Sequence, residues 1–326
     1  RIELPTVKLY TDTSMSMPIF VKRGKRKGPT LFISAAIHGD ELNGIEIISR
    51  IIQSKALKNI RGSLIAVPIV NGYGLLNQSR YLPDRRDLNR SFPGSKRGSL
   101  AGRIADLFLN EIVSKCEYGI DLHTGSQHRS NLPQIRANLD DSQTLDMAKA
   151  FGVPVILNSN LRDGSLRECA DGLGVRIILY EAGEALRFNE LSIRAGVNGI
   201  LNVMRHLDML PKSRSKKPRP EPWVARSSSW TRATDSGFTS HKKDLGDHVE
   251  IGDLLAEIKD PYGNILDKVI NKTAGIIIGK QNIPLVQEGE AMYHIAHFSA
   301  PDEVAEHLEQ MHDDLMDVDV APAYFN

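Results

Sequence analysis

Short apolar runs alternate with longer segments of helical periodicity along the first two thirds of the chain. The apolar runs predict buried strands over residues 30–37, 63–70, 118–122, 153–157 and 175–180. The segments between them place apolar residues three and four positions apart, which predicts helices over residues 41–52, 98–115, 142–151 and 190–207. This alternation is typical of βα units on a largely parallel sheet, and it predicts an α/β domain over residues 1–210.

The pattern changes after residue 210. Residues 211–222 combine prolines with basic side chains and contain almost nothing apolar, a composition that favours a linker over an anion-binding segment. Short strands separated by glycines follow, and they predict a small all-β barrel-sandwich domain over residues 223–300. Residues 301–326 predict one amphipathic helix and an acidic tail.

The composition argues against several classes of protein. Lys and Arg number 41 against 40 Asp and Glu, so no net field attracts nucleic acid. No apolar run approaches the roughly 20 residues that cross a bilayer, and we expect neither a nucleic-acid nor a membrane partner. The two cysteines, Cys116 and Cys169, cannot form a disulfide framework. We therefore expect a cytoplasmic protein, although the sequence leaves open what precedes Arg1.

Polar residues follow three of the predicted strands. One strand leads into His38 and Glu41, a second into His123 and a third into Glu181. A single histidine after a strand is usually structural. In open α/β sheets, however, ligands bind at the carboxyl ends of the strands, and three such ends together predict a shared site.

Two histidines and one carboxylate are the ligand set of a catalytic zinc ion that keeps a fourth position open for water. Such an ion activates the water and polarises a carbonyl group. A second carboxylate must then move the proton from the water to the leaving amine. Glu181 fits this task because it lies on another strand and is not required as a ligand. Asp121 lies two residues before His123 and on the same side of the strand, where it could orient the imidazole or simply cap a turn.

Four short motifs carry a resemblance to a known family. HGDE at residues 38–41, DLNR at 87–90, DLHTG at 121–125 and YEAG at 180–183 resemble, in this order and spacing, the succinylglutamate desuccinylase and aspartoacylase family. The members are relatives of the zinc carboxypeptidases and carry a small C-terminal β domain. The resemblance therefore implies a zinc-carboxypeptidase-like catalytic domain with a mixed, mostly parallel sheet, and it covers nearly the whole chain.

The resemblance also implies roles for individual residues. It makes His38, Glu41 and His123 the ligands of one Zn²⁺ per chain, and it makes Glu181 the general base and acid. Asn89 and Arg90 would hold the substrate's α-carboxylate, a task that suits the guanidinium fork.

Arg80 would stabilise the oxyanion in the same family. The connection from Arg80 to the DLNR motif is two residues longer than the family's pattern, so Arg85 and Arg86 are rivals, with an exposed basic loop as the other interpretation. Arg136 and Arg167 either contact the acyl part of a substrate or form structural ion pairs. His128 is expected at the surface.

Residues 245–275 resemble a biotinyl or lipoyl carrier domain. The expected carrier turn reads Pro-Tyr-Gly-Asn at residues 261–264 and has no lysine at its tip, and Lys259 and Lys268 lie off the turn. This favours a structural or gating role over carriage of a swinging arm.

The residues and the resemblance together predict a zinc-dependent amidohydrolase that removes the acyl group from a small N-acyl amino acid. One alternative is a metallocarboxypeptidase acting on a short peptide. The other is a non-catalytic binding protein on the same fold, which Glu181 argues against because binding alone would not require it. A homo-oligomer is the usual default, and the sequence leaves the acyl group and the amino acid open.

Overall fold

The computed structural model describes residues 1–159, 161–212 and 222–298. Within them a 13-stranded mixed sheet and a 4-stranded sheet form the framework. The strands of the first part are β1 (Ile2–Lys8), β2 (Ser14–Arg23), β3 (Arg26–Ala35), β4 (Arg61–Val67), β5 (Tyr118–Gly125), β6 (Arg129–Ala137), β7 (Val155–Asn158) and β8 (Arg176–Glu184). The α-helices are α1 (Asn43–Gln53), α2 (Gly72–Leu76), α3 (Leu100–Glu111), α4 (Ser142–Phe151), α5 (Leu166–Gly172) and α6 (Glu190–His206).

The centre of the large sheet consists of four parallel strands in the order β4-β3-β5-β8. Strand β2 continues it on one side and β6 on the other, both antiparallel to their neighbours. The predicted α/β class with a mixed, mostly parallel sheet is confirmed. Strands β1, β2 and β6 were not predicted, because their polar residues interrupt the apolar runs on which the prediction relied.

Helices cover the large sheet on both faces. Leu31 and Ile33 of β3 belong to a core that includes residues of α1, α4 and α6, whereas Phe32 belongs to a second core with Phe108 of α3. Since successive side chains of a strand point to opposite faces, β3 is buried on both sides. A strand in this position needs a continuous apolar sequence, which is why it was predictable.

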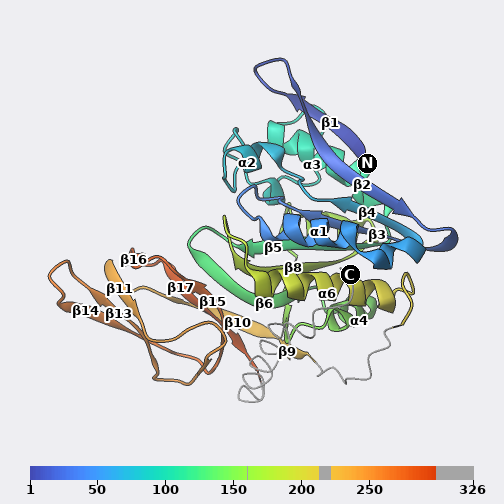
Figure 1. Ribbon diagram of the computed structural model, residues 1–326. Helices are drawn as coiled ribbons and strands as arrows, with labels where there is room; N and C mark the ends of the chain where they lie inside the picture. The colour runs from blue at the N-terminus through green and yellow to red at the C-terminus, as the bar shows by residue number, and fades with distance from the viewer. Residues whose placement is uncertain (160, 213–221, 299–326) are drawn as a thin grey trace.

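The C-terminal part consists of short strands. They are β9 (Trp223–Ala225), β10 (Ser227–Arg232), β11 (Gly237–His241), β12 (His248–Val249), β13 (Leu254–Lys259), β14 (Ile265–Ile270), β15 (Gly275–Gln281), β16 (Leu285–Val286) and β17 (Ala291–His297). Strands β14, β13, β11 and β16 form the small sheet, while β15, β17 and β10 extend the large one. Figure 1 shows the small sheet projecting to the left of the helices.

The predicted carrier turn lies between β13 and β14, and the exposed residue near its tip is Tyr262 rather than a lysine. The expected domain boundaries remain predictions. Most of the linker, at residues 213–221, and the expected helix and acidic tail at residues 301–326 lie outside the described residues.

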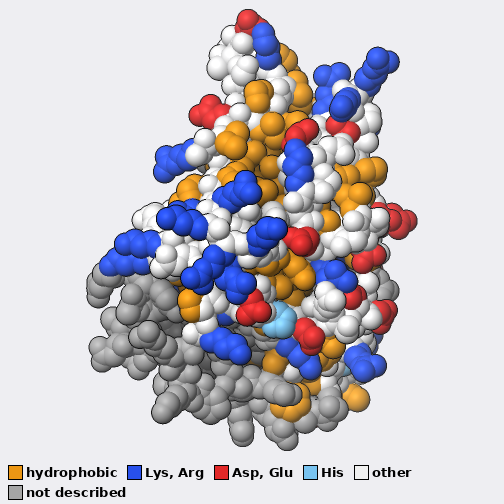
Figure 2. Space-filling model, turned by 90° about the vertical axis from the view of Figure 1, so that its right-hand side faces the viewer, with side chains coloured by type: hydrophobic (Ala, Val, Ile, Leu, Met, Phe, Trp, Pro, Cys, Tyr) orange, Lys and Arg blue, Asp and Glu red, His pale blue; other side chains and the backbone are white. Residues whose placement is uncertain are grey.

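The described residues contain no helix with the length and apolar character needed to span a membrane. On the face shown in Figure 2, basic, acidic and apolar side chains are interspersed. This agrees with the nearly equal numbers of basic and acidic residues in the chain.

Candidate active site

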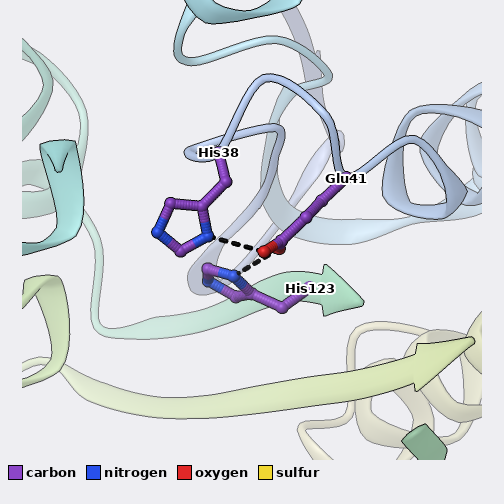
Figure 3. A group of neighbouring side chains, drawn as sticks. All are labelled: His38, Glu41 and His123. Carbon is purple, nitrogen blue, oxygen red and sulfur yellow. Dashed lines mark hydrogen bonds and ion pairs between the residues drawn. The ribbon is translucent and has the colours of Figure 1, made fainter. Parts of the chain in front are cut away.

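Three buried side chains meet at the carboxyl ends of two central strands. His38 and Glu41 lie in the loop between β3 and α1, and His123 lies on β5, the parallel neighbour of β3. Glu41 Oε1 is 2.7 Å from His38 Nδ1, and Glu41 Oε2 is 2.8 Å from His123 Nδ1. Figure 3 shows the carboxylate pointing between the two imidazoles. The predicted meeting of these residues is confirmed, and together they could hold a metal ion.

The loop that carries His38 and Glu41 depends on two features of its sequence. Gly39 passes so close to the backbone of Gly74 that a Cβ atom would lie 1.9 Å from a carbonyl carbon. Asn71 fixes the neighbouring backbone, since its amide donates to Ile37 O and its carbonyl oxygen accepts from Gly74 N. A side chain at position 39 would therefore displace the loop and its two polar side chains.

A second carboxylate lies at hydrogen-bond distance from the Nε2 atom of each imidazole, the nitrogen that points away from Glu41. Asp87 Oδ1 is 3.1 Å from His38 Nε2, and Asp121 Oδ2 is 2.7 Å from His123 Nε2. Ser34 in turn donates to Asp121. Protons on the two Nε2 atoms would satisfy these carboxylates and leave the Nδ1 lone pairs directed at the shared centre. This arrangement is common around histidines that bind metals.

The electrostatics of the group favour positive charge at its centre. Burial works to raise the pKa of Glu41, but the two imidazoles outweigh it and hold the pKa well below the usual range. Burial works to lower the pKa of His123 and of His38, but the carboxylates around them raise both values. A donor set of two nitrogens and one carboxylate oxygen, inside a ring of carboxylates, fits a divalent cation such as zinc.

Glu181 lies on β8, next to β5, and faces the same cavity. Asn131 Nδ2 donates to its Oε1 atom at 2.6 Å, and Arg136 Nε is 2.7 Å from its Oε2 atom. Both partners come from β6, the antiparallel neighbour of β8. The structure places Arg136 in an ion pair with Glu181 and in the lining of the same cavity, a position that agrees with either of its two predicted roles.

Arg80 lies beside the three central residues. Its Nη2 atom is 2.9 Å from Asp87 Oδ2, and its Nη1 atom is 3.5 Å from Glu41 Oε1. Arg85 and Arg86 are exposed, and the described lining of the cavity includes Arg80 but neither of them. Of the three candidates, only Arg80 lies where it could contact a reacting group.

Asn89 and Arg90 line the cavity a short distance along the chain from Asp87. Asn89 is buried, and its side-chain oxygen Oδ1 accepts a hydrogen bond from Leu166 N. This leaves the side-chain NH₂ group of Asn89 for another partner. Arg167 is 7 % exposed and contacts Ser159, and burial lowers its pKa to about 10. His128 lies exposed, as predicted.

The cavity has a volume of about 880 Å³ and carries a large excess of basic side chains. Among the described residues, eight arginines line it, against three glutamates. The arginines are Arg80, Arg90, Arg129, Arg136, Arg162, Arg167, Arg226 and Arg232. Within the described parts of the chain, no carboxylate lies at ion-pair distance from Arg90, Arg162 or Arg226. The cavity is therefore suited to anions.

The sequence did not reveal the wall that the C-terminal part contributes. Trp230 of β10 stacks on His294 of β17 with ring centroids 4.4 Å apart, and the Arg129 guanidinium lies 5.7 Å from the centroid of the Trp230 ring. No motif marks these residues. Asp87 and Asn131 were also missed as partners of His38 and Glu181, although Asp87 opens the DLNR motif and could have been found there.

The fold and the site define an α/β protein with a buried His–Glu–His group that could hold a metal ion at the edge of a cationic cavity. Residues 27–207 match the model of the succinylglutamate desuccinylase/aspartoacylase catalytic domain. Since the match spans more than half of the chain, the protein belongs to this family, as its motifs predicted.

Similar proteins are known in sequence and in structure. The N-alpha-acetyl-L-2,4-diaminobutyric acid deacetylase of Halomonas elongata is 29 % identical over 250 residues, which cover 74 % of this chain and 72 % of the relative. Two solved structures share the fold at 24 % identity. The ectoine utilization protein EutE (DoeB) of Ruegeria pomeroyi, with bound product, has a TM-score of 0.82 over 90 % of this chain and 93 % of its own. A succinylglutamate desuccinylase/aspartoacylase of Rhodobacter sphaeroides has a TM-score of 0.81 over 91 % and 94 %.

Proposed function

We propose that the protein is a zinc-dependent amidohydrolase that cleaves the amide bond of an N-acyl amino acid. The observation that carries this proposal is the buried group of His38, Glu41 and His123 at the edge of a cavity that Glu181 also faces. The name of the Halomonas elongata relative, an N-acetyl amino acid deacetylase, supports the same reaction class. Bound to the three ligands, Zn²⁺ would supply an activated water molecule and polarise the amide carbonyl.

The residues around this group divide the remaining tasks. The Glu181 carboxylate takes the proton from the attacking water and returns it to the nitrogen of the leaving amine. The guanidinium of Arg80 lies beside His38 and Glu41, where negative charge would develop on the carbonyl oxygen. Asn89 and Arg90 hold the α-carboxylate and thereby align the amide bond.

The charge of the cavity indicates the class of substrate. A dianionic substrate, such as an N-acyl acidic amino acid or an N-succinyl amino acid, would place a second carboxylate among the remaining arginines. An N-acetyl diaminobutyrate would instead place a protonated amine among them, at a cost of like-charge repulsion. We therefore expect this chain to prefer dianionic substrates over N-acetyl diaminobutyrate, the compound in the name of its Halomonas elongata relative.

A kinetic panel tests the proposal. The zinc-loaded protein would be assayed with N-acetyl and N-succinyl forms of glutamate, alanine and diaminobutyrate, and with an acidic tripeptide. We expect the largest kcat/KM for a dianionic N-acyl amino acid. A larger kcat/KM for the tripeptide would favour the carboxypeptidase alternative, and a larger value for acetyl-diaminobutyrate would contradict the charge argument. No turnover of any compound would favour the binding-protein alternative.

A further inference from the structure

A strand of the C-terminal part pairs directly with the strand that holds Glu181 in place. Strand β15 is antiparallel to β6, and the register sets Gly279 opposite Asn131 and Lys280 opposite Ser130. On its other side β6 pairs with β8, the strand of Glu181. The C-terminal part is thus only one strand away from the proposed general base.

Asn131 connects the two. It is 7 % exposed, and its Nδ2 atom donates to Glu181 Oε1 at 2.6 Å. The oxygen end of the Asn131 side-chain amide lies against β15, since a Cβ atom added at Gly279 would come within 2.9 Å of Asn131 Oδ1. Because residue 279 is a glycine, the Asn131 side chain has room to reach the Glu181 carboxylate.

A second contact braces the same pair of strands. Asn282, just after β15, donates twice from Nδ2, to Ser130 Oγ at 2.6 Å and to Glu184 Oε2 at 2.8 Å. Its backbone N–H also donates to His128 O. These bonds tie the start of β6 to the end of β8, three residues beyond Glu181.

We propose that Asn131 is a positioning residue for Glu181 and that strand β15 of the C-terminal part holds Asn131 in the required orientation. The inference rests on the proposed function, because it assumes that Glu181 transfers the proton. The hydrogen bond from Asn131 to one oxygen fixes the plane of the carboxylate, and the ion pair with Arg136 adds an electrostatic attraction at the other oxygen, so the carboxylate is held in one orientation toward the cavity. Loss of such alignment slows the chemical step more than it weakens substrate binding.

Substitution of Asn131 gives the first test. Asn131→Asp is nearly isosteric but replaces the donating NH₂ group with an acceptor, and Asn131→Ala removes the group. We expect kcat to fall roughly 10- to 100-fold in both variants, while KM changes less than threefold and zinc content stays at the wild-type level. Wild-type kcat in Asn131→Asp would overturn the proposal.

Substitution of Gly279 tests the role of β15. Its backbone does not require glycine by its φ angle, and in Gly279→Ala the closest clash is with the end of the Asn131 side chain, so the strand is expected to persist. We expect a lower kcat in Gly279→Ala, and no further loss when the substitution is made in Asn131→Ala. Equal losses in both backgrounds would overturn the proposal. Gly172→Ala is the matched control, because a Cβ at Gly172 meets nothing within 4 Å.

Glu181→Gln separates failure of this inference from failure of the proposed function. Retained turnover in Glu181→Gln would overturn the function proposed for Glu181 itself. An inactive Glu181→Gln beside wild-type kcat in Asn131→Asp and Gly279→Ala would leave the function standing and reject the positioning role. Near-ultraviolet circular dichroism checks that each variant retains its tertiary packing.

Discussion

Two regions of the molecule bury histidines, and the histidines behave in opposite ways. In the α/β part His38 and His123 are 3 % and 5 % exposed, and in the C-terminal part His294 is 4 % exposed. Burial works to lower the pKa of all three. Carboxylates reverse the effect at His38 and His123, whereas the pKa of His294 is lowered to about 3 by burial, with a smaller contribution from Arg136.

The difference lies in the partners. His38 and His123 each contact two carboxylates, His38 those of Glu41 and Asp87 and His123 those of Glu41 and Asp121. His294 instead contacts the hydroxyl of Ser228 and stacks on Trp230. Burial alone therefore does not identify a ligand. The two histidines that carboxylates contact on both ring nitrogens are those that could hold a metal ion, whereas His294, whose partner is a hydroxyl, lines the cavity beside Trp230.

Removal of either histidine proposed as a metal ligand should have the largest effect. We expect His38→Ala and His123→Ala to lose zinc and to lose turnover to the level of a protein-free blank, because only two ligands remain. His294→Phe, which keeps a ring beside Trp230, should retain zinc. Elemental analysis of the purified variants measures this directly. Full zinc in either alanine variant would show that the ligand assignment is wrong.

The meeting of His38 and His123 could be predicted because they directly follow or lie within strands that are apolar and buried on both faces. Parallel strands bring their carboxyl ends to one edge of the sheet, so a local signal located His38, His123 and Glu181 together. Asn131 could not be found in this way. It lies on β6, where polar residues interrupt the apolar run, and its function depends on pairing with strands distant in the sequence.

The C-terminal wall was unpredictable for a related reason. Glycine spacing and short apolar runs predicted a β domain, but the pairing of β15 with β6 is long-range and has no sequence signature. The stacking of Trp230 on His294 follows from the register of β10 with β17, which sets the two residues opposite each other. Sequence patterns thus located the groups that follow buried strands, and the groups that depend on strand register required the structure.

Glu181→Gln should have the next largest effect. Glu181 contacts Asn131 and Arg136 rather than a histidine, so its loss should leave zinc content unchanged. A general acid–base group typically contributes about 10² to 10⁴-fold in rate, and we expect kcat to fall within that range. A decrease of less than tenfold in a steady-state assay would remove Glu181 from the proton transfer.

Substitution of Asp121 or Asp87, the carboxylates that contact the Nε2 atoms of His123 and His38, should have a smaller effect, on zinc affinity. We expect Asp121→Asn and Asp87→Asn each to weaken zinc affinity by roughly 10- to 100-fold, the usual result of removing a hydrogen-bond partner of a ligand histidine. Competition with a chromogenic chelator measures the affinity. Ser228→Ala, which removes the partner of His294, is the matched control and should leave the affinity unchanged. Equal affinities in all three variants would contradict the distinction drawn between the two regions.

The smallest expected effect is on the free energy of unfolding, and it tests whether the pKa of buried His294 is lowered. An imidazole in the unfolded chain has a pKa of about 6.5, and the pKa of buried His294 is lowered to about 3. Between these values the unfolded chain binds a proton that the folded chain does not, so the free energy of unfolding falls as the pH falls. From pH 7 to pH 5 the imidazole should lower it by about 2 kcal/mol. We therefore expect urea titrations at the two pH values to show a smaller loss in His294→Phe than in the wild type, by about this amount. An equal loss in both proteins would mean that folded His294 accepts the proton, and the contrast with His38 and His123 would then rest on contacts alone.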